Sequence, residues 1–203
     1  MKKLLAIAAG LMLIGTTAFA QSFGAGYVNS IQKYNNKSTA ANGFYAGFGY
    51  TAEILPGLSL NPGIYYEFIT APEQSIHFGK LASFSGKSTE HYVNVPLQLS
   101  YAIAFSPSFK LFLYGGPTAN IGIASTTKVA GTILGYSDGE IINNYEDKDY
   151  SRFDIMLGGG IGAEIAEKVR ITAGYDFGML NRLKNTDDVM KRNRLTAGAA
   201  FIF

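Results

Sequence analysis

Strict alternation of apolar and polar residues limits most strongly what this chain can fold into. In the stretch KVRITAGYDFGM, residues 168–179, every second position from Val169 to Met179 is apolar. The positions between them, which include Arg170 and Asp176, carry charged residues, threonine or glycine. An amphipathic helix needs apolar residues every third or fourth position, so this period of two predicts a β-strand with one apolar face.

The same period of two recurs along the chain in segments of about ten residues, which is the length that a tilted strand needs to cross a bilayer. We expect eight strands, at residues 22–31, 43–54, 58–68, 90–103, 110–123, 152–165, 168–179 and 193–203. The 24 glycines, 13 tyrosines and 14 phenylalanines also favour strands and close packing over helices.

The connections between these strands alternate between short and long. The short ones are LPG, SPS and a turn at Glu167. The long ones are polar and cover residues 33–42, 71–89, 124–151 and 182–192. This is the layout of an outer-membrane barrel with turns in the periplasm and loops outside the cell. The sequence therefore predicts an all-β fold, an eight-stranded antiparallel up-and-down transmembrane β-barrel with both termini in the periplasm.

The beginning of the chain predicts a secretory signal peptide. Two lysines precede an apolar run, and the small residues Ala18 and Ala20 suit cleavage before Gln21. We therefore expect residues 1–20 to be removed and residues 21–203 to form a single barrel domain.

Charge and cysteine content exclude other classes of protein. Without the two lysines of the signal segment, the chain carries equal numbers of basic and acidic residues. No basic surface for nucleic acid is therefore expected. The chain has no cysteine, so packing and backbone pairing must hold the domain together without disulfides or a thiolate metal site.

A secreted soluble barrel of the lipocalin type is the rival fold, because it also has eight strands but carries its apolar residues inside. The face opposite the apolar one carries nine charged residues, which we assign to a lumen charge network: Glu53, Glu67, Lys110, Arg152, Asp154, Glu164, Arg170, Asp176 and Arg194. In a soluble barrel these charges would face solvent instead. They therefore do not decide between the two folds.

The last ten residues, RLTAGAAFIF, favour the membrane barrel. Thr196, Gly198, Phe201 and Phe203 follow the order polar, glycine, aromatic, aromatic, which resembles the C-terminal signal read by the barrel assembly machinery. A terminal strand with an apolar lipid-facing side can add its edge to another strand. The assembly machinery is therefore an expected partner.

Three longer stretches resemble a known family. They are YVNVPLQLSYAI, LYGGPTANIGI and FDIMLGGGIGAEIAEKVRITAGYDFGMLN, and they are similar to the outer-membrane β-barrel domain family, which includes porin-family and PorT-like proteins of Gram-negative bacteria. The resemblance implies contact with outer-membrane lipid and lipopolysaccharide, and it permits partners in a secretion complex. The chain departs from the family at Asn94, where relatives often have an acidic residue two positions before the proline.

No catalytic site and no cofactor are expected. Ser88, Glu90 and His91 lie close together and suggest a lipid-modifying serine hydrolase. However, neighbouring residues of a strand point to alternate faces, which does not align a nucleophile with its base. The carboxylates of residues 137–140 and 145–150 suggest a divalent-ion site, but their spacing fits no defined ion loop.

The inward charges predict two tiers in the lumen. We expect Lys110, Glu164 and Arg170, from neighbouring strands, to form a ladder near the short turns, with Glu53 nearby. The other five charged residues would form a second tier closer to the outer loops. Eight strands leave a lumen just wide enough for side chains, so unpaired charges there would be costly.

Together these features favour a non-enzymatic barrel with a closed lumen and a structural or interaction role through its outer loops. The alternatives are an accessory component of a secretion or assembly complex, a narrow solute channel and a lipid-modifying hydrolase.

Overall fold

Strands make up almost the whole of the molecule. The computed structural model of the chain describes residues 19–35, 37–78, 82–133, 136–146, 150–184 and 187–203. These residues form ten strands, β1 (Phe19–Tyr34), β2 (Lys37–Leu55), β3 (Leu58–Thr70), β4 (Gln74–Phe78), β5 (Ala82–Ser106), β6 (Phe109–Ile133), β7 (Tyr136–Asn143), β8 (Phe153–Ile165), β9 (Val169–Gly178) and β10 (Met190–Ile202). Within the described residues, no helix is long and apolar enough to span a membrane.

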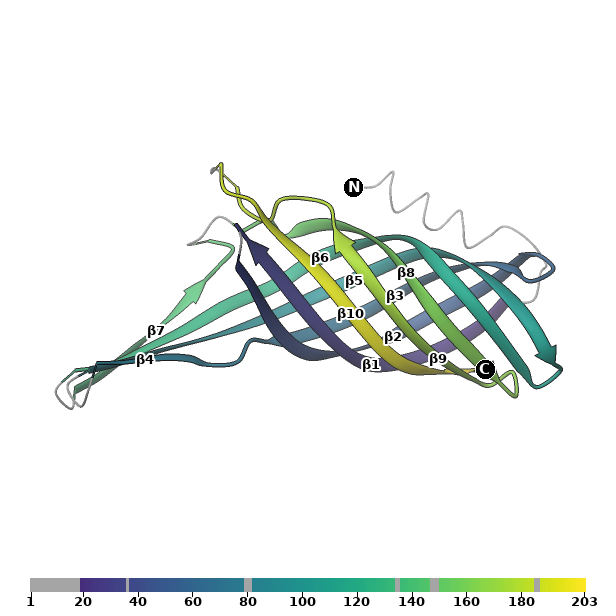
Figure 1. Cartoon of the computed structure of the whole chain (residues 1–203), viewed down its shortest axis with the longest axis horizontal. Helices are drawn as coiled ribbons and strands as arrows, with labels where there is room; N and C mark the ends of the chain where they lie inside the picture. Colours follow the sequence, from purple (N-terminus) through teal and green to yellow (C-terminus); the bar gives the residue numbers. More distant parts are fainter. Residues whose placement is uncertain (1–18, 36, 79–81, 134–135, 147–149, 185–186) are drawn as a thin grey trace.

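Eight of the ten described strands form a closed antiparallel ring in the order β1, β2, β3, β5, β6, β8, β9, β10 (Figure 1). Strand β1 closes the ring by pairing with β10, from Ser22 opposite Ile202 to Tyr34 opposite Met190. The apolar face of each ring strand points outward. For example, Leu113 is 65% exposed. The expected eight-stranded up-and-down barrel is confirmed, with an apolar exterior that suits contact with lipid.

Three short turns lie together at one end of the ring, which we call the short-turn end. They connect β2 to β3, β5 to β6 and β8 to β9. Gly57 occupies the first turn with a φ of +80°, a conformation that favours glycine. The C-terminus lies at the same end (Figure 1), where the Phe203 N–H donates to the Gln21 carbonyl at 2.9 Å. The opposite end is called the hairpin end.

The strands continue into stretches that the sequence predicts as long loops. Strand β5 begins at Ala82, within residues 71–89, and β6 ends at Ile133, within residues 124–151. Beyond the ring, β5 and β6 pair with β4 and β7 in a four-stranded extension, the projecting sheet (Figure 1). Strands β1 and β2 likewise occupy most of residues 33–42. The loop prediction is wrong here because Thr, Val, Ile, Phe and Tyr retain strand propensity where no lipid requires an apolar outer face.

The apolar side chains change face where β5 and β6 leave the ring. Inside the ring, residues such as Val95 point outward and are 40% exposed. In the projecting sheet, Ile76, Phe84 and Val129 lie instead on the face that continues the lumen, where they line one groove. The outward positions of β5 there are polar, as at Lys87 and Thr89. The sheet therefore carries an apolar inner face beyond the ring.

The predicted signal cleavage site lies at the edge of the described region. Ala18 lies outside the described residues, whereas Ala20 and Gln21 lie within β1. Ala20 is paired with Thr51, so cleavage before Gln21 would leave the pairs from Gln21 onward in place. The signal peptide of residues 1–20 stays a prediction.

Candidate functional site: the charged lumen

A buried layer of charged and amide side chains crosses the middle of the lumen. We call it the central charge layer, and it consists of Glu67, Asn94, Asn120, Asp176, Arg192 and Arg194. Glu67 is fully buried and accepts hydrogen bonds from Arg192 at 2.6 Å, from Arg194 at 2.9 Å and from Asn94 at 2.9 Å. Each acidic oxygen of Glu67 therefore has a charged donor.

The alternation of strand β10 explains how this layer forms. Arg192 and Arg194 are two residues apart, so both point into the lumen. Arg194 lies in register with Asp176 of the adjacent strand β9, and its Nε and Nη2 donate to Asp176 Oδ2 at 3.0 and 2.6 Å. Glu67 belongs to β3, which is not a neighbour of β10, so its pairs with the two arginines span the lumen.

Neutral side chains complete the central charge layer. Asn120 donates to Asn94 Oδ1 at 2.6 Å, which links β6 to β5. The guanidinium carbon of Arg192 lies 4.0 Å from the centre of the Tyr92 ring, in cation–π contact. With two arginines and two carboxylates, the layer is formally neutral.

A second buried group, the hairpin-end cluster, lies between the central charge layer and the hairpin end and is centred on Glu90. The Glu90 carboxylate accepts from Arg182 at 2.9 Å, from the Tyr92 hydroxyl at 2.8 Å, and from Ser125 and Gln32 at 3.1 Å each. Burial alone would lower the pKa of Arg182, but the Glu90 carboxylate together with the Tyr92 and Tyr145 hydroxyls outweighs burial and raises the pKa of this guanidinium above its ordinary value. Arg182 therefore stays charged and holds the segment after β9 over the lumen.

The charges at the short-turn end form a third group, the short-turn tier. Lys110 Nζ lies 3.3 Å from Glu164 and 3.5 Å from Glu167, and Arg170 donates to Glu164 at 2.8 Å. The structure thus brings Lys110, Glu164 and Arg170 together. Their side chains are 13 to 33% exposed, whereas that of Glu167 is 68% exposed. Water therefore reaches this tier.

Three of the predicted network residues make no ion pair with any described residue. Glu53 accepts from a backbone N–H in the β2–β3 turn at 3.0 Å, and Asp154 accepts from a backbone N–H after β9 at 3.0 Å. Arg152 is exposed, donates to the Ile123 carbonyl at 2.9 Å and covers the Tyr145 ring at 4.3 Å. The structure places Arg152 at the hairpin end rather than in the central charge layer.

The four C-terminal residues singled out by the sequence lie on two faces of β10. Thr196 lines the lumen, and a Cβ at Gly198 would overlap the Tyr45 hydroxyl, so glycine makes room for that ring. Phe201 and Phe203 point outward and are 52% and 61% exposed. The apolar exterior of the barrel thus continues to its last residue, and recognition by the assembly machinery stays a prediction.

The predicted lumen charge network left out three buried charged residues, Arg182, Arg192 and Glu90. The predicted last strand begins at residue 193, one position after Arg192, because Lys191 and Asn193 are polar and the apolar–polar alternation ends there. Glu90 could have been found, because it lies two positions before the inward-facing Tyr92 at the start of the predicted strand 90–103. No periodic signal marks Arg182, which lies in an irregular segment.

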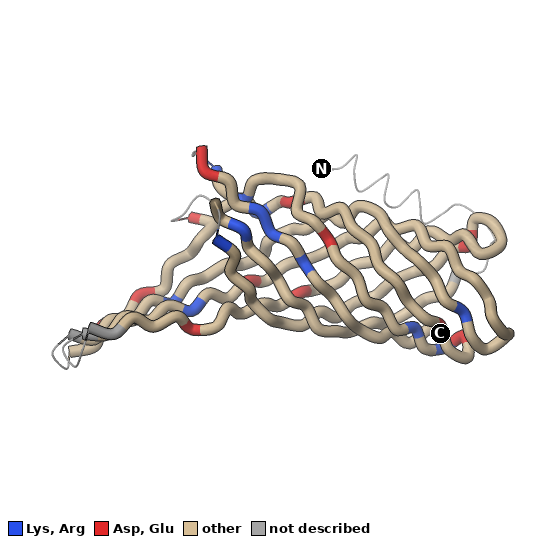
Figure 2. Tube along the Cα trace, viewed as in Figure 1, with Lys and Arg blue, Asp and Glu red and all other residues tan. Residues whose placement is uncertain are grey.

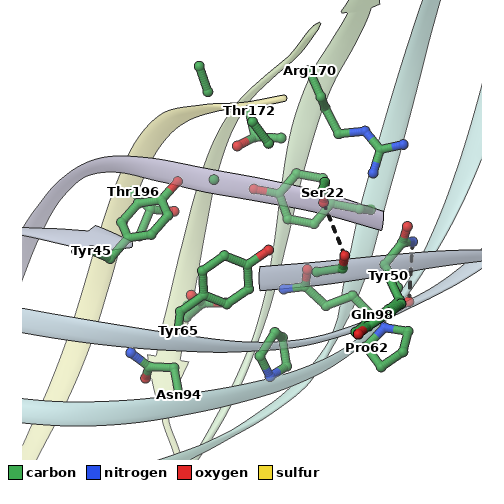
Figure 3. A pocket seen from close by; sticks show the side chains of 18 of the residues that line it. Ser22, Tyr45, Tyr50, Pro62, Tyr65, Asn94, Gln98, Arg170, Thr172 and Thr196 are labelled. Carbon is green, nitrogen blue, oxygen red and sulfur yellow. Dashed lines mark hydrogen bonds between the residues drawn. The ribbon is translucent and has the colours of Figure 1, made fainter. Parts of the chain in front are cut away.

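The described residues line at least three spaces along the lumen. A central cavity of about 140 Å³ is lined by Tyr45, Tyr65 and Tyr114, among others. Figure 3 shows Tyr45 and Tyr65 side by side in this cavity, with their ring centres 5.9 Å apart. A space of about 650 Å³ at the short-turn end shares Phe112 and Arg170 with the central cavity. These two spaces therefore adjoin each other.

The third space is a groove of about 440 Å³ at the hairpin end. It has no lining residue in common with the central cavity. Asn94 and Arg194 of the central charge layer line the central cavity, and Glu90 of the hairpin-end cluster lines the groove. Buried charged side chains therefore separate the groove from the rest of the lumen.

The residues considered for catalysis do not share a face. Ser88 points inward, with its hydroxyl 2.9 Å from that of Thr127, and Glu90 is held by Arg182. His91 points outward, where its Nδ1 lies 2.6 Å from the Tyr66 hydroxyl. A nucleophile and base on opposite sides of the barrel wall cannot act together.

The carboxylates considered for a divalent ion are not gathered in the described region. Within the described residues, no group of three or more His, Cys, Asp or Glu side chains could hold a metal ion. Residues 147–149 of the predicted acidic stretch lie outside the described residues.

The closed ring, its apolar exterior and its charged lumen define a transmembrane β-barrel. The family model described as outer membrane protein beta-barrel domain matches residues 10–184. The chain belongs to this family and is an outer-membrane β-barrel protein, which confirms the resemblance seen in the sequence.

Several solved outer-membrane proteins are similar to this chain in fold. Ail, the attachment invasion locus protein of Yersinia pestis, is 15% identical, with 92% of this chain and 100% of that chain covered at a TM-score of 0.45. Neisserial surface protein A is also 15% identical, with 92% and 99% covered at a TM-score of 0.45. OprG of Pseudomonas aeruginosa is 13% identical, with 93% and 98% covered at a TM-score of 0.36. No curated protein sequence matches the chain.

Proposed function

We propose that the protein is a closed, non-enzymatic barrel that acts at the cell surface through its hairpin end, in a structural or interaction role. The observation that carries closure is the central charge layer. Glu67 is 0% exposed and is bound by two arginines whose strand lies across the lumen. Moving any of these side chains to open a path would leave a buried charge without its partner, which is strongly unfavourable.

The orientation follows from the two ends of the barrel. Outer-membrane barrels have short turns in the periplasm and long segments outside the cell. The short-turn end would therefore face the periplasm, together with the C-terminus. The projecting sheet would extend from the cell surface.

The interaction role is supported by the apolar inner face of the projecting sheet. Ile76 is 61% exposed and Val129 is 36% exposed, and both line the hairpin-end groove. In the proposed orientation this groove opens at the cell surface on the inner face of the sheet, which lipid does not cover. Apolar surface in such a position is typical of contacts with another protein.

The second candidate function is that of an accessory component of a secretion or assembly complex. The apolar inner face of the projecting sheet would then bind the other components. We would isolate the tagged protein from outer membranes after cross-linking and compare it with Ile76→Thr/Val129→Thr. The matched control is Ser75→Ala/Ala130→Thr, on the opposite face of the projecting sheet, where neither residue lines the groove. A partner in fixed ratio that only the first variant loses would support the interaction role. A partner retained by both variants would rule out this face.

Closure is tested by conductance. Purified protein in planar bilayers should give no steady single-channel steps at moderate voltage, because the central charge layer blocks the lumen. Reproducible steps in the unmodified protein would overturn the closed barrel and favour the narrow channel. Circular dichroism typical of β-strands must show that the protein sample used for the bilayers is folded.

A further inference from the structure

The charged side chains on the outer wall of the barrel are all of one kind. Within the described parts of the ring strands, the outward positions hold four charged residues, and all are lysines: Lys33, Lys87, Lys128 and Lys191. Their neighbours fix the direction. Gln32, Ser88, Thr127 and Arg192 each bond to side chains on the inner face, so the adjoining lysines point outward. The Asp, Glu and Arg residues of the same strands are at inward positions.

The four lysines form two directly opposed pairs. Lys33 of β1 faces Lys191 of β10, and Lys87 of β5 faces Lys128 of β6. All four side chains belong to exposed residues. Like charges directly opposite each other on one face of a sheet destabilise it. An anion between the two ammonium groups would remove that repulsion.

The protein itself supplies no such anion in the region that the structure describes. None of the four lysines makes an ion pair with a described carboxylate. Lys110 at the short-turn end provides the contrast, since it lies within 3.5 Å of two glutamates. The outward lysines at the hairpin end are therefore left with uncompensated positive charge.

Both pairs lie just past the apolar outer wall, at the hairpin end. Lys33 is two positions beyond the outward-facing Ile31, and Lys87 is four positions beyond His91. The transition is also marked by Asn42, whose side-chain oxygen accepts from Tyr27 at 2.5 Å and from Asn29 at 2.7 Å on the outer wall. Figure 2 shows basic residues at this end of the strands, with acidic residues among them, and a further basic group at the short-turn end. The two lysine pairs lie at the depth at which a membrane barrel meets lipid headgroups.

We propose that each lysine pair binds a phosphate group of the lipopolysaccharide in the outer leaflet. A phosphate monoester carries between one and two negative charges and offers several strong acceptor oxygens, so it can bridge two ammonium groups. The pairs lie on different strand pairs, β1–β10 and β5–β6, and so form two separate sites. The assignment rests on the proposed orientation, which puts the hairpin end in the outer leaflet.

The test measures binding of phosphorylated and dephosphorylated lipid A to the full mature protein. The protein is reconstituted in phosphatidylcholine vesicles that are prepared with a fluorescent lipid A of one kind or the other in both leaflets. We expect the unmodified protein to prefer the phosphorylated form by about tenfold or more at each site. Lys33→Gln/Lys191→Gln and Lys87→Gln/Lys128→Gln should each remove one site, and the fourfold variant should lose the preference.

The matched control is Lys37→Gln/Lys184→Gln. It removes two exposed lysines at the same end, neither of which belongs to an opposed outward pair. The control should keep both sites. An equal loss in the control, or a full preference in the fourfold variant, would overturn the proposal. Strand circular dichroism shows whether each variant has folded.

A further arm separates lipid phosphate from free phosphate. Inorganic phosphate at millimolar concentration should compete poorly with lipid A, because only the lipid is concentrated at the bilayer surface. Equal competition would overturn the assignment to lipopolysaccharide. The vesicles contain lipid A in both leaflets, so this result does not depend on orientation in the cell. Orientation is measured separately with a membrane-impermeant thiol reagent on intact cells carrying Lys87→Cys, since the chain has no cysteine of its own.

Discussion

The central charge layer and the short-turn tier contain the same kinds of side chain, but their surroundings differ. Glu67 and Arg192 have side-chain exposures of 0%, whereas Lys110 is 33% exposed. In the central layer, charges are removed from water and depend on one another. In the short-turn tier, water can solvate a charge whose ion-pair partner has been removed. Equivalent changes should therefore have very different effects in the two places.

The largest effect is expected for Glu67→Gln. This change removes the charge that two buried arginines share, and it should cost about 3–5 kcal/mol of unfolding free energy. The measurement is equilibrium unfolding in urea in lipid vesicles. Glu164→Gln in the short-turn tier is the matched control, because it also removes a carboxylate from two basic partners. If the two variants lost equal stability, burial would not distinguish the regions.

The next effect is expected for Arg192→Met. Glu67 keeps Arg194 and Asn94 as donors in this variant, so the cost should be about 1–3 kcal/mol. Methionine fills much of the space beside the Tyr92 ring. Urea unfolding should therefore rank this variant between Glu67→Gln and the unmodified protein. A loss as large as that of Glu67→Gln would mean that Arg192 alone neutralises Glu67.

The sequence predicts the short-turn tier more readily than the central layer because turn length controls register. Lys110 is opposite Glu164, and Glu164 is opposite Arg170. Each residue lies only a few positions from the end of its strand. Alternation and the position of a short turn are enough to bring such residues together.

The central layer depends on features that alternation does not specify. Arg194 and Asp176 are neighbours on paired strands, but Glu67 reaches Arg192 and Arg194 across the lumen. The sequence also does not show how far β10 continues once the strand has left the membrane, where both faces are polar. The fold of the ring could therefore be predicted, while the contacts across it and the projecting sheet could not.

Arg170→Glu tests whether the short-turn tier controls the lumen. Two acidic side chains would then face each other across β8 and β9, which should cost about 1–2 kcal/mol because Lys110 and water moderate the repulsion. The protein should remain silent in planar bilayers, since the central charge layer is intact. Single-channel steps whose ion selectivity changed with this substitution would favour a channel whose conduction this tier controls.

The smallest effect is expected for Lys110→Gln. Lys110 makes long contacts of 3.3 and 3.5 Å, and one of its partners, Glu167, is 68% exposed. An ion pair of this kind contributes about 0–1 kcal/mol, and salt screens it further. Urea unfolding at low salt should therefore show a small loss that shrinks as sodium chloride is added. The loss caused by Arg192→Met should not change with salt, because ions do not reach a fully buried guanidinium. If the loss of unfolding free energy in Lys110→Gln did not change with salt, Lys110 would behave like the buried Arg192. The difference between the two regions would then come from the partners of their charges and not from the access of water.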